Sequence, residues 1–201
     1  MPTSRLEAFS DGVLAIIITI MVLELPKPEG ASLGDLWHST GVGFFSYVLS
    51  FVYVGIYWNN HHHFFHVVDH VTGTLLWANL NSLFWLSLLP FSTGWMAETS
   101  FAPAPILVYG VNLLSAGVAY LTLQRVAISS NVCHSRIKRA LDKDRKGPAS
   151  FILYAVGVIC AAISLWGGWH MFDYFAVAAY VVVAILWVIP DKRMEKAFTE
   201  A

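Results

Sequence analysis

The sequence predicts an all-α polytopic membrane protein with six transmembrane helices. Of its 201 residues, 57% are hydrophobic and 12% are charged, whereas a soluble domain carries roughly 45–50% apolar and about 25% charged residues. The mean hydropathy is +0.61. A bilayer-spanning helix needs roughly 20 mostly apolar residues, so six spans take up about 120 residues. The rest suffices only for short loops, which excludes a soluble enzyme, a nucleic-acid-binding protein and a disulfide scaffold.

Proline and glycine mark where the spans end. Pro26 ends the first apolar run, Pro90 lies near the end of the third, and Pro190 stops the last, because proline lacks the backbone N–H that continues a helix. The pair Gly167–Gly168 separates the fifth run from the sixth. The predicted spans form a single six-helix transmembrane domain over residues 1–201 and are residues 6–25, 42–60, 75–91, 106–123, 150–166 and 172–189.

The distribution of Lys and Arg sets the orientation. If the N-terminus is cytoplasmic and six spans alternate, all of the 12 Lys and Arg residues except Lys27 lie on the cytoplasmic side. The sequence therefore predicts a multi-pass protein of the cell (plasma or inner) membrane, with both termini cytoplasmic. The basic stretch 136–146 is interpreted as a determinant of this topology in preference to a binding site for anionic lipid.

The first span begins with an unusually polar segment, Arg5 to Gly12. A charged side chain near the hydrocarbon zone costs at least a few kcal/mol unless it is paired or hydrated. Asp11 therefore either has partners on other spans or lies at the interface, stabilised by water and the helix dipole. The candidate partners for Asp11 are His61, Trp77 and Asn79.

Helical geometry separates two faces of this span. At 100° per residue, Asp11 lies nearly opposite Ile16. If the Ile16 face surrounds a symmetry axis, a ring of Ile16 is an apolar constriction that blocks ions by dewetting. The alternative is that this stripe contacts lipid or neighbouring helices. Its members are Arg5, Phe9, Gly12, Ile16, Thr19, Ile20 and Leu23.

Several motifs resemble one family of channels. Arg5 and Phe9-Ser10-Asp11, followed by the run 14–19, are similar to the first helix of the transmembrane protein 175 family. These are lysosomal and prokaryotic potassium channels without a carbonyl-lined selectivity filter. The resemblance continues through Trp58-x-x-His61 and Trp77-x-Asn79, and is most specific over residues 5–25 and 58–91.

The resemblance implies a function. The first helix of each subunit would line the pore of a homo-oligomer, a tetramer in prokaryotic relatives, through which potassium passes passively. Ile16 would form the hydrophobic constriction, Leu23 a second apolar layer, and Thr19 a position linked to cation preference. The stripe adds Gly12 and Ile20 to the pore lining. The network that anchors the first helix would comprise Arg5, Phe9, Ser10, Asp11, His61, Trp77 and Asn79.

A histidine cluster follows the second span. On a continuous helix His62, His66 and His70 would share one face, as in a metal site or a pH sensor. We prefer a wet span end for these residues and expect no metal, no cofactor and no catalytic residue, while pH modulation stays open.

Three other functions compete with the potassium channel. A proton-conducting channel would use the hydrated histidines. A coupled secondary transporter would show charge at mid-depth and broken helices; here charge is confined to the start of the first span, and no central span is expected to be broken by proline. A membrane enzyme would need a convergent acid/base or metal set, which the sequence does not display.

Val54-Gly55-Ile56-Tyr57 is interpreted as a chance likeness to a potassium filter.

Overall fold

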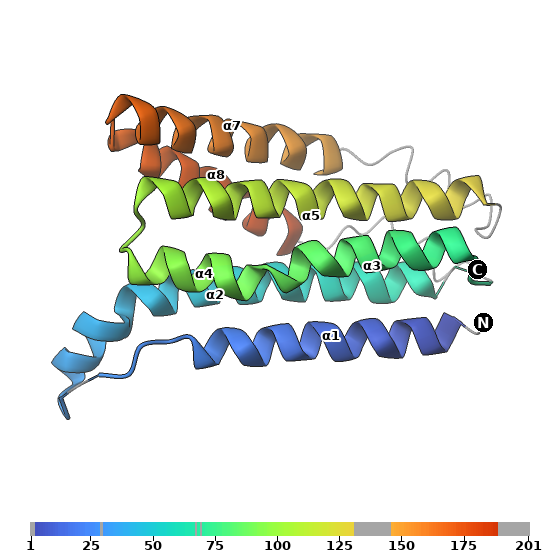
Figure 1. Ribbon diagram of the computed structural model, residues 1–201, viewed down its shortest axis with the longest axis horizontal. Coiled ribbons are helices and arrows are strands. Elements are labelled where there is room, and N and C mark those ends of the chain that lie inside the picture. The colour runs from blue at the N-terminus through green and yellow to red at the C-terminus, as the bar shows by residue number, and fades with distance from the viewer. Residues whose placement is uncertain (1–2, 29, 67, 69, 131–145, 189–201) are drawn as a thin grey trace.

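The molecule is a bundle of helices that run back and forth along one axis (Figure 1). The computed structural model describes residues 3–28, 30–66, 68, 70–130 and 146–188. Cys133, most of the basic stretch 136–146 and the basic residues of the C-terminus lie outside the described residues. The helices are α1 (Thr3–Leu23), α2 (Leu33–Phe65), α3 (Gly73–Ser87), α4 (Leu89–Glu98), α5 (Pro103–Ser129), α7 (Lys146–Gly167) and α8 (Met171–Val188).

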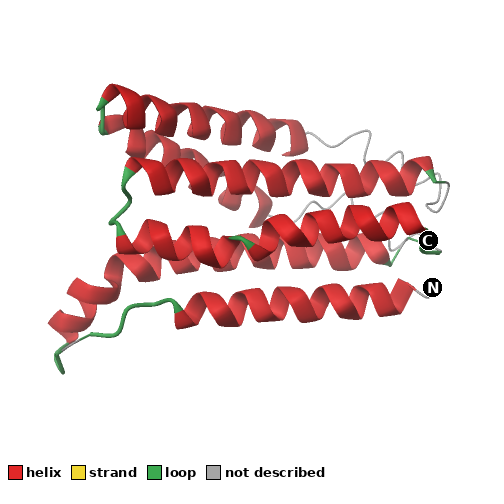
Figure 2. Cartoon of the chain, viewed as in Figure 1, coloured by secondary structure: helices red, strands yellow, loops and turns green. Residues whose placement is uncertain are grey.

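Five of these helices, α1, α2, α5, α7 and α8, are long and apolar enough to cross a membrane. They coincide with the predicted spans 6–25, 42–60, 106–123, 150–166 and 172–189, and the structure extends most of them beyond the expected ends. Short loops join α1 to α2, α4 to α5 and α7 to α8 (Figure 2). The all-helical membrane architecture is therefore confirmed.

The structure differs from the prediction at the third span. Instead of one helix over residues 75–91, α3 ends at Ser87 and α4 begins at Leu89 and continues to Glu98. Leu88 joins them with a distorted turn, because Pro90 at the start of α4 has no N–H to continue the ladder. The two helices follow one another along the bundle (Figure 1). The expectation that proline breaks no central span was wrong, because Pro90 lies where the predicted third span divides into α3 and α4.

The second helix begins well before its predicted span. Ser32 caps α2 by accepting a hydrogen bond from the Asp35 backbone N–H, and the Asp35 carboxylate accepts one from the Ser32 N–H. This reciprocal capping satisfies N–H groups that a helix start leaves unpaired. The extra turns lie before the apolar region that was used to predict residues 42–60, so the apolar pattern alone could not locate them.

The centre of the bundle is rich in buried tyrosines, which hold α2, α5 and α8 together. Tyr53, Tyr109 and Tyr180 are fully buried. Tyr53 donates a hydrogen bond to the Tyr180 carbonyl, and Ser50 lies 3.0 Å from the Tyr109 hydroxyl. α1 lies at an edge of the bundle (Figure 1), where it packs against α2, α3 and α4. One side of α1 is therefore left uncovered by the described part of its own chain.

Candidate functional site on the first helix

α1 has a buried face and an exposed face. Its buried residues are Leu6, Ser10, Leu14, Ile17 and Met21. Every member of the stripe predicted from helical geometry is exposed, namely Arg5, Phe9, Gly12, Ile16, Thr19, Ile20 and Leu23. The exposed fraction is 58% for Ile16 and 79% for Leu23. Apart from Arg5 and Thr19, the helix thus presents an apolar strip away from its own bundle.

A chain of hydrogen bonds holds the buried face of α1 to α2 and α3. The Ser10 hydroxyl donates to the Leu6 carbonyl at 2.9 Å and accepts from the Asn79 amide at 3.0 Å. The Asn79 oxygen lies 2.8 Å from Nε2 of His61. Because that oxygen can only accept, His61 carries its proton on Nε2. The donors therefore follow one order: His61 donates to Asn79, Asn79 to Ser10, and Ser10 to the Leu6 carbonyl. Ser10, His61 and Asn79 are all buried, so the chain is shielded from water.

Asp11 has a different partner from those predicted. Its Oδ1 accepts a hydrogen bond of 3.1 Å from the indole N–H of Trp58 on α2. His61 and Asn79 bind one another and Ser10 instead. Trp77, the third predicted partner, is 75% exposed on α3. The carboxylate therefore faces its own subunit, as helical geometry indicated, but through a tryptophan that had not been assigned to it.

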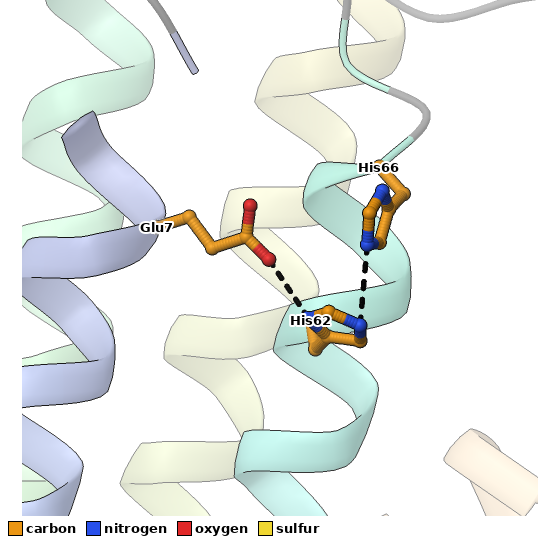
Figure 3. Close-up of side chains that lie close together, drawn as sticks. All are labelled: Glu7, His62 and His66. Carbon is orange, nitrogen blue, oxygen red and sulfur yellow. Dashed lines mark hydrogen bonds and ion pairs between the residues drawn. The ribbon is translucent and has the colours of Figure 1, made fainter. Parts of the chain in front are cut away.

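One turn from this contact, Glu7 meets His62 of α2, which in turn contacts His66, the residue that caps the end of α2 (Figure 3). Glu7 Oε1 lies 2.8 Å from Nδ1 of His62, and Nε2 of His62 lies 3.1 Å from Nε2 of His66. Ligand atoms of the three residues lie within 4.8 Å of one another. His70 does not join them, because α2 ends at Phe65 and the shared face expected for His62, His66 and His70 ends with it.

The predicted anchoring network is thus assembled only in part. Ser10, His61 and Asn79 are joined directly, and Asp11 is anchored through Trp58. Arg5, Phe9 and Trp77 lie on exposed surfaces of the subunit. Sequence reasoning missed two contacts between α1 and α2, namely Asp11 with Trp58 and Glu7 with His62. The available signal was their spacing: Glu7 and Asp11 on one helix, and Trp58 and His62 on the other, are each one turn apart.

Comparisons with known proteins agree on one family. Residues 5–90 match the family described as endosomal/lysosomal potassium channel TMEM175. A potassium channel of Chryseobacterium sp. (strain P1-3) is 46% identical over 200 residues, covering 100% of each chain. The endosomal/lysosomal proton channel TMEM175 of Homo sapiens is 34% identical over 112 residues, which are 50% of this chain and 22% of the human protein.

The fold agrees as well. The crystal structure of a lysosomal potassium-selective channel TMEM175 homolog from Chamaesiphon minutus superposes with a TM-score of 0.75 at 26% identity, covering 93% of this chain and 96% of the other. Relatedness along the full length, a shared helical fold and the match over the first three predicted spans lead to the same assignment. The chain belongs to the TMEM175 family of ion channels.

Proposed function

We propose that the protein is a passive, potassium-preferring cation channel of the cell membrane, with both termini cytoplasmic. α1 of each subunit lines a central pore in a homo-oligomer, a tetramer as the family resemblance implies. The observation that carries this proposal is the exposed strip of α1, which includes Ile16, Thr19 and Leu23. The potassium channels named among its relatives support the choice of ion.

An oligomer is needed because one subunit cannot surround a pore with α1. Within the residues that the structure describes, this helix packs against α2, α3 and α4 on one side only. Its remaining side presents Ile16 and Leu23 with exposed fractions of 58% and 79%. Copies of α1 around an axis give a pore wall, and the other helices of each subunit separate that wall from lipid.

Ion control in such a pore falls to apolar rings and one hydroxyl. Rings of Ile16 and Leu23, seven residues apart in the sequence and hence about 10 Å apart along the axis, close the pore by dewetting. Between them, Thr19 Oγ1 donates its proton to the Ile16 carbonyl at 2.8 Å. The hydroxyl oxygen therefore keeps lone pairs available to a dehydrating cation. Without a carbonyl ladder to replace the hydration shell, we expect modest selectivity.

The test substitutes Ile16 with Asn and measures potassium flux into liposomes that contain the purified protein. A polar ring at the constriction should wet the pore, so leak flux rises and the preference for potassium over sodium falls. Ile159→Asn on α7 is the matched control, because Ile159 is 57% exposed against 58% for Ile16. It should conduct like the wild type. Equal flux in wild type and Ile16→Asn would exclude Ile16 as the constriction.

Proton conduction is the second candidate, favoured by the human relative that is named a proton channel. The same liposomes, loaded with a pH-sensitive dye and given a proton gradient without potassium, separate the two. Acidification that Ile16→Asn accelerates would assign protons to the same pore. The break between α3 and α4 removes one argument against a coupled transporter, namely that its central spans are unbroken. Such a transporter would require a co-ion gradient for uptake, whereas a channel conducts down the potassium gradient alone.

A further inference from the structure

We propose that Glu7, His62 and His66 form a binding site for a divalent transition-metal ion that links α1 to α2. The three side chains come from two helices and converge at the end of the bundle where α1 begins and α2 ends (Figure 3). Ligand atoms from all three lie within 4.8 Å of one another. The site is thus already gathered, and a small rotation of side chains closes it.

The spacing of the two imidazoles fits a tetrahedral ion. Bonds of about 2.0–2.1 Å from Zn²⁺ to nitrogen, at a tetrahedral angle, place two ligand nitrogens roughly 3.3–3.4 Å apart. The Nε2 atoms of His62 and His66 are 3.1 Å apart, and the histidines are one helical turn from each other. The distance between the two nitrogens therefore needs to change by only tenths of an ångström, while the two rings, whose planes are 88° apart, must turn so that both lone pairs point at the ion.

Glu7 supplies the third ligand and makes the site a bridge between helices. Its carboxylate already lies against His62, at 2.8 Å from Nδ1. The long, unbranched side chain can turn one oxygen toward an ion held by the histidines, and water completes the tetrahedron. Two imidazoles and one carboxylate favour zinc and related metals, whereas Mg²⁺ and Ca²⁺ select all-oxygen ligand sets.

The site is open to ions from solution yet partly fixed by its neighbours. The side chains of His62 and Glu7 are 40% and 20% exposed, and His66 is exposed. Trp58 stacks on the His62 ring with a centroid separation of 6.1 Å and an interplanar angle of 23°. This stacking limits the orientations of the imidazole, so less freedom is lost when a metal binds.

The experiment measures Zn²⁺ binding to the full chain in detergent, by competition with a chelating dye after treatment with EDTA. We expect one zinc per chain, and at least about tenfold weaker binding in Glu7→Gln, His62→Gln and His66→Gln, since even outer-shell changes weaken metal sites 10–100-fold. His70→Gln is the matched control and should bind like the wild type, because His70 lies outside the cluster. His66 is exposed, so its variant should keep the wild-type fold; thermal unfolding without zinc checks this.

Three results would overturn the proposal. The first is a wild-type chain that binds no zinc, in which case the three residues form only a hydrogen-bonded relay. The second is full zinc affinity in both His62→Gln and His66→Gln. The third is a loss of zinc affinity in His70→Gln. Full affinity in Glu7→Gln alone would overturn the bridge between α1 and α2, leaving a site on α2 only.

Restraint of α1 by the metal rests on the proposed function and has its own measurement. If α1 lines the pore, a metal that ties it to α2 should slow potassium flux in wild-type liposomes and not in those with His62→Gln. Zinc that binds without altering flux would overturn the restraint. A chain that conducts no potassium in any condition would overturn the proposed function, while the binding result would still decide on the metal site.

Discussion

Replacing Asn79 with Ala should destabilise the attachment of α1 to the bundle by about 2–5 kcal/mol. Asn79 accepts from His61 at 2.8 Å and donates to Ser10 at 3.0 Å. Hydrogen bonds between membrane helices average about 0.6 kcal/mol and reach about 1.7, so the two bonds account for roughly 1–2 kcal/mol. The His61 N–H is then left buried without an acceptor, a further penalty of about 1–3 kcal/mol. Ser10 loses little, because it still donates to Leu6.

The assay is equilibrium unfolding of the purified protein in mixed micelles of a mild detergent and SDS. Asn60→Ala is the matched control, because the Asn60 amide donates to the Ile56 carbonyl of its own helix and bonds to no second helix among the described residues. The control should lose less than about 1 kcal/mol, in line with the net value of one hydrogen bond. If Asn79→Ala unfolds at the same SDS fraction as Asn60→Ala, the buried chain of hydrogen bonds does not hold α1 in place.

Two further predictions concern other contacts. Asp11→Ala, which leaves the Trp58 indole N–H without its acceptor, should lower the yield of assembled protein or its potassium flux; normal yield together with normal flux would show that Asp11 is only an interfacial residue. Gly157→Ala should lower the unfolding free energy by about 1–3 kcal/mol, because a Cβ there would collide with the Tyr180 ring. Gly55→Ala, where a Cβ meets open space, should be neutral, and equal losses in both variants would refute the packing argument.

The sequence was most informative about which way each face of α1 points. Helical periodicity alone placed Asp11 nearly opposite Ile16, at 100° per residue, and in the structure Ile16 is exposed while Asp11 bonds to Trp58 of its own subunit. The pairing of polar residues was predictable in kind, since a buried amide or imidazole inside a membrane must find a partner. Ser10, His61 and Asn79, which the family resemblance places in the anchoring network, bond to one another in the structure.

What the sequence could not supply was the register between helices. The assignment of Trp58 to Asp11, and of His62 to Glu7, depends on how far α2 slides along α1. Apolar periodicity fixes the rotation of a helix but not this sliding, because lipid and leucine are equally apolar partners. The break at Leu88 was missed for a related reason: Pro90 can end a helix or interrupt it, and only packing of the following turn against the bundle decides between the two.

The contacts of α1 divide the helix into two parts with different mechanical roles. Within the described residues, the hydrogen bonds of its side chains to other helices all involve Glu7, Ser10 and Asp11, in its first half. From Gly12 to Leu23 the helix is held by apolar packing, and Thr19 bonds only to the carbonyl of Ile16 on α1 itself. Directional bonds fix a register, whereas apolar contacts between helices in lipid can be exchanged for lipid at little cost. A displacement of α1 that preserves its hydrogen bonds must therefore be largest toward Leu23 and smallest at Glu7. In the proposed pore, a ring of Leu23 side chains would therefore widen before a ring of Ile16. The proposed metal ion at Glu7 would bind at the end of α1 that moves least.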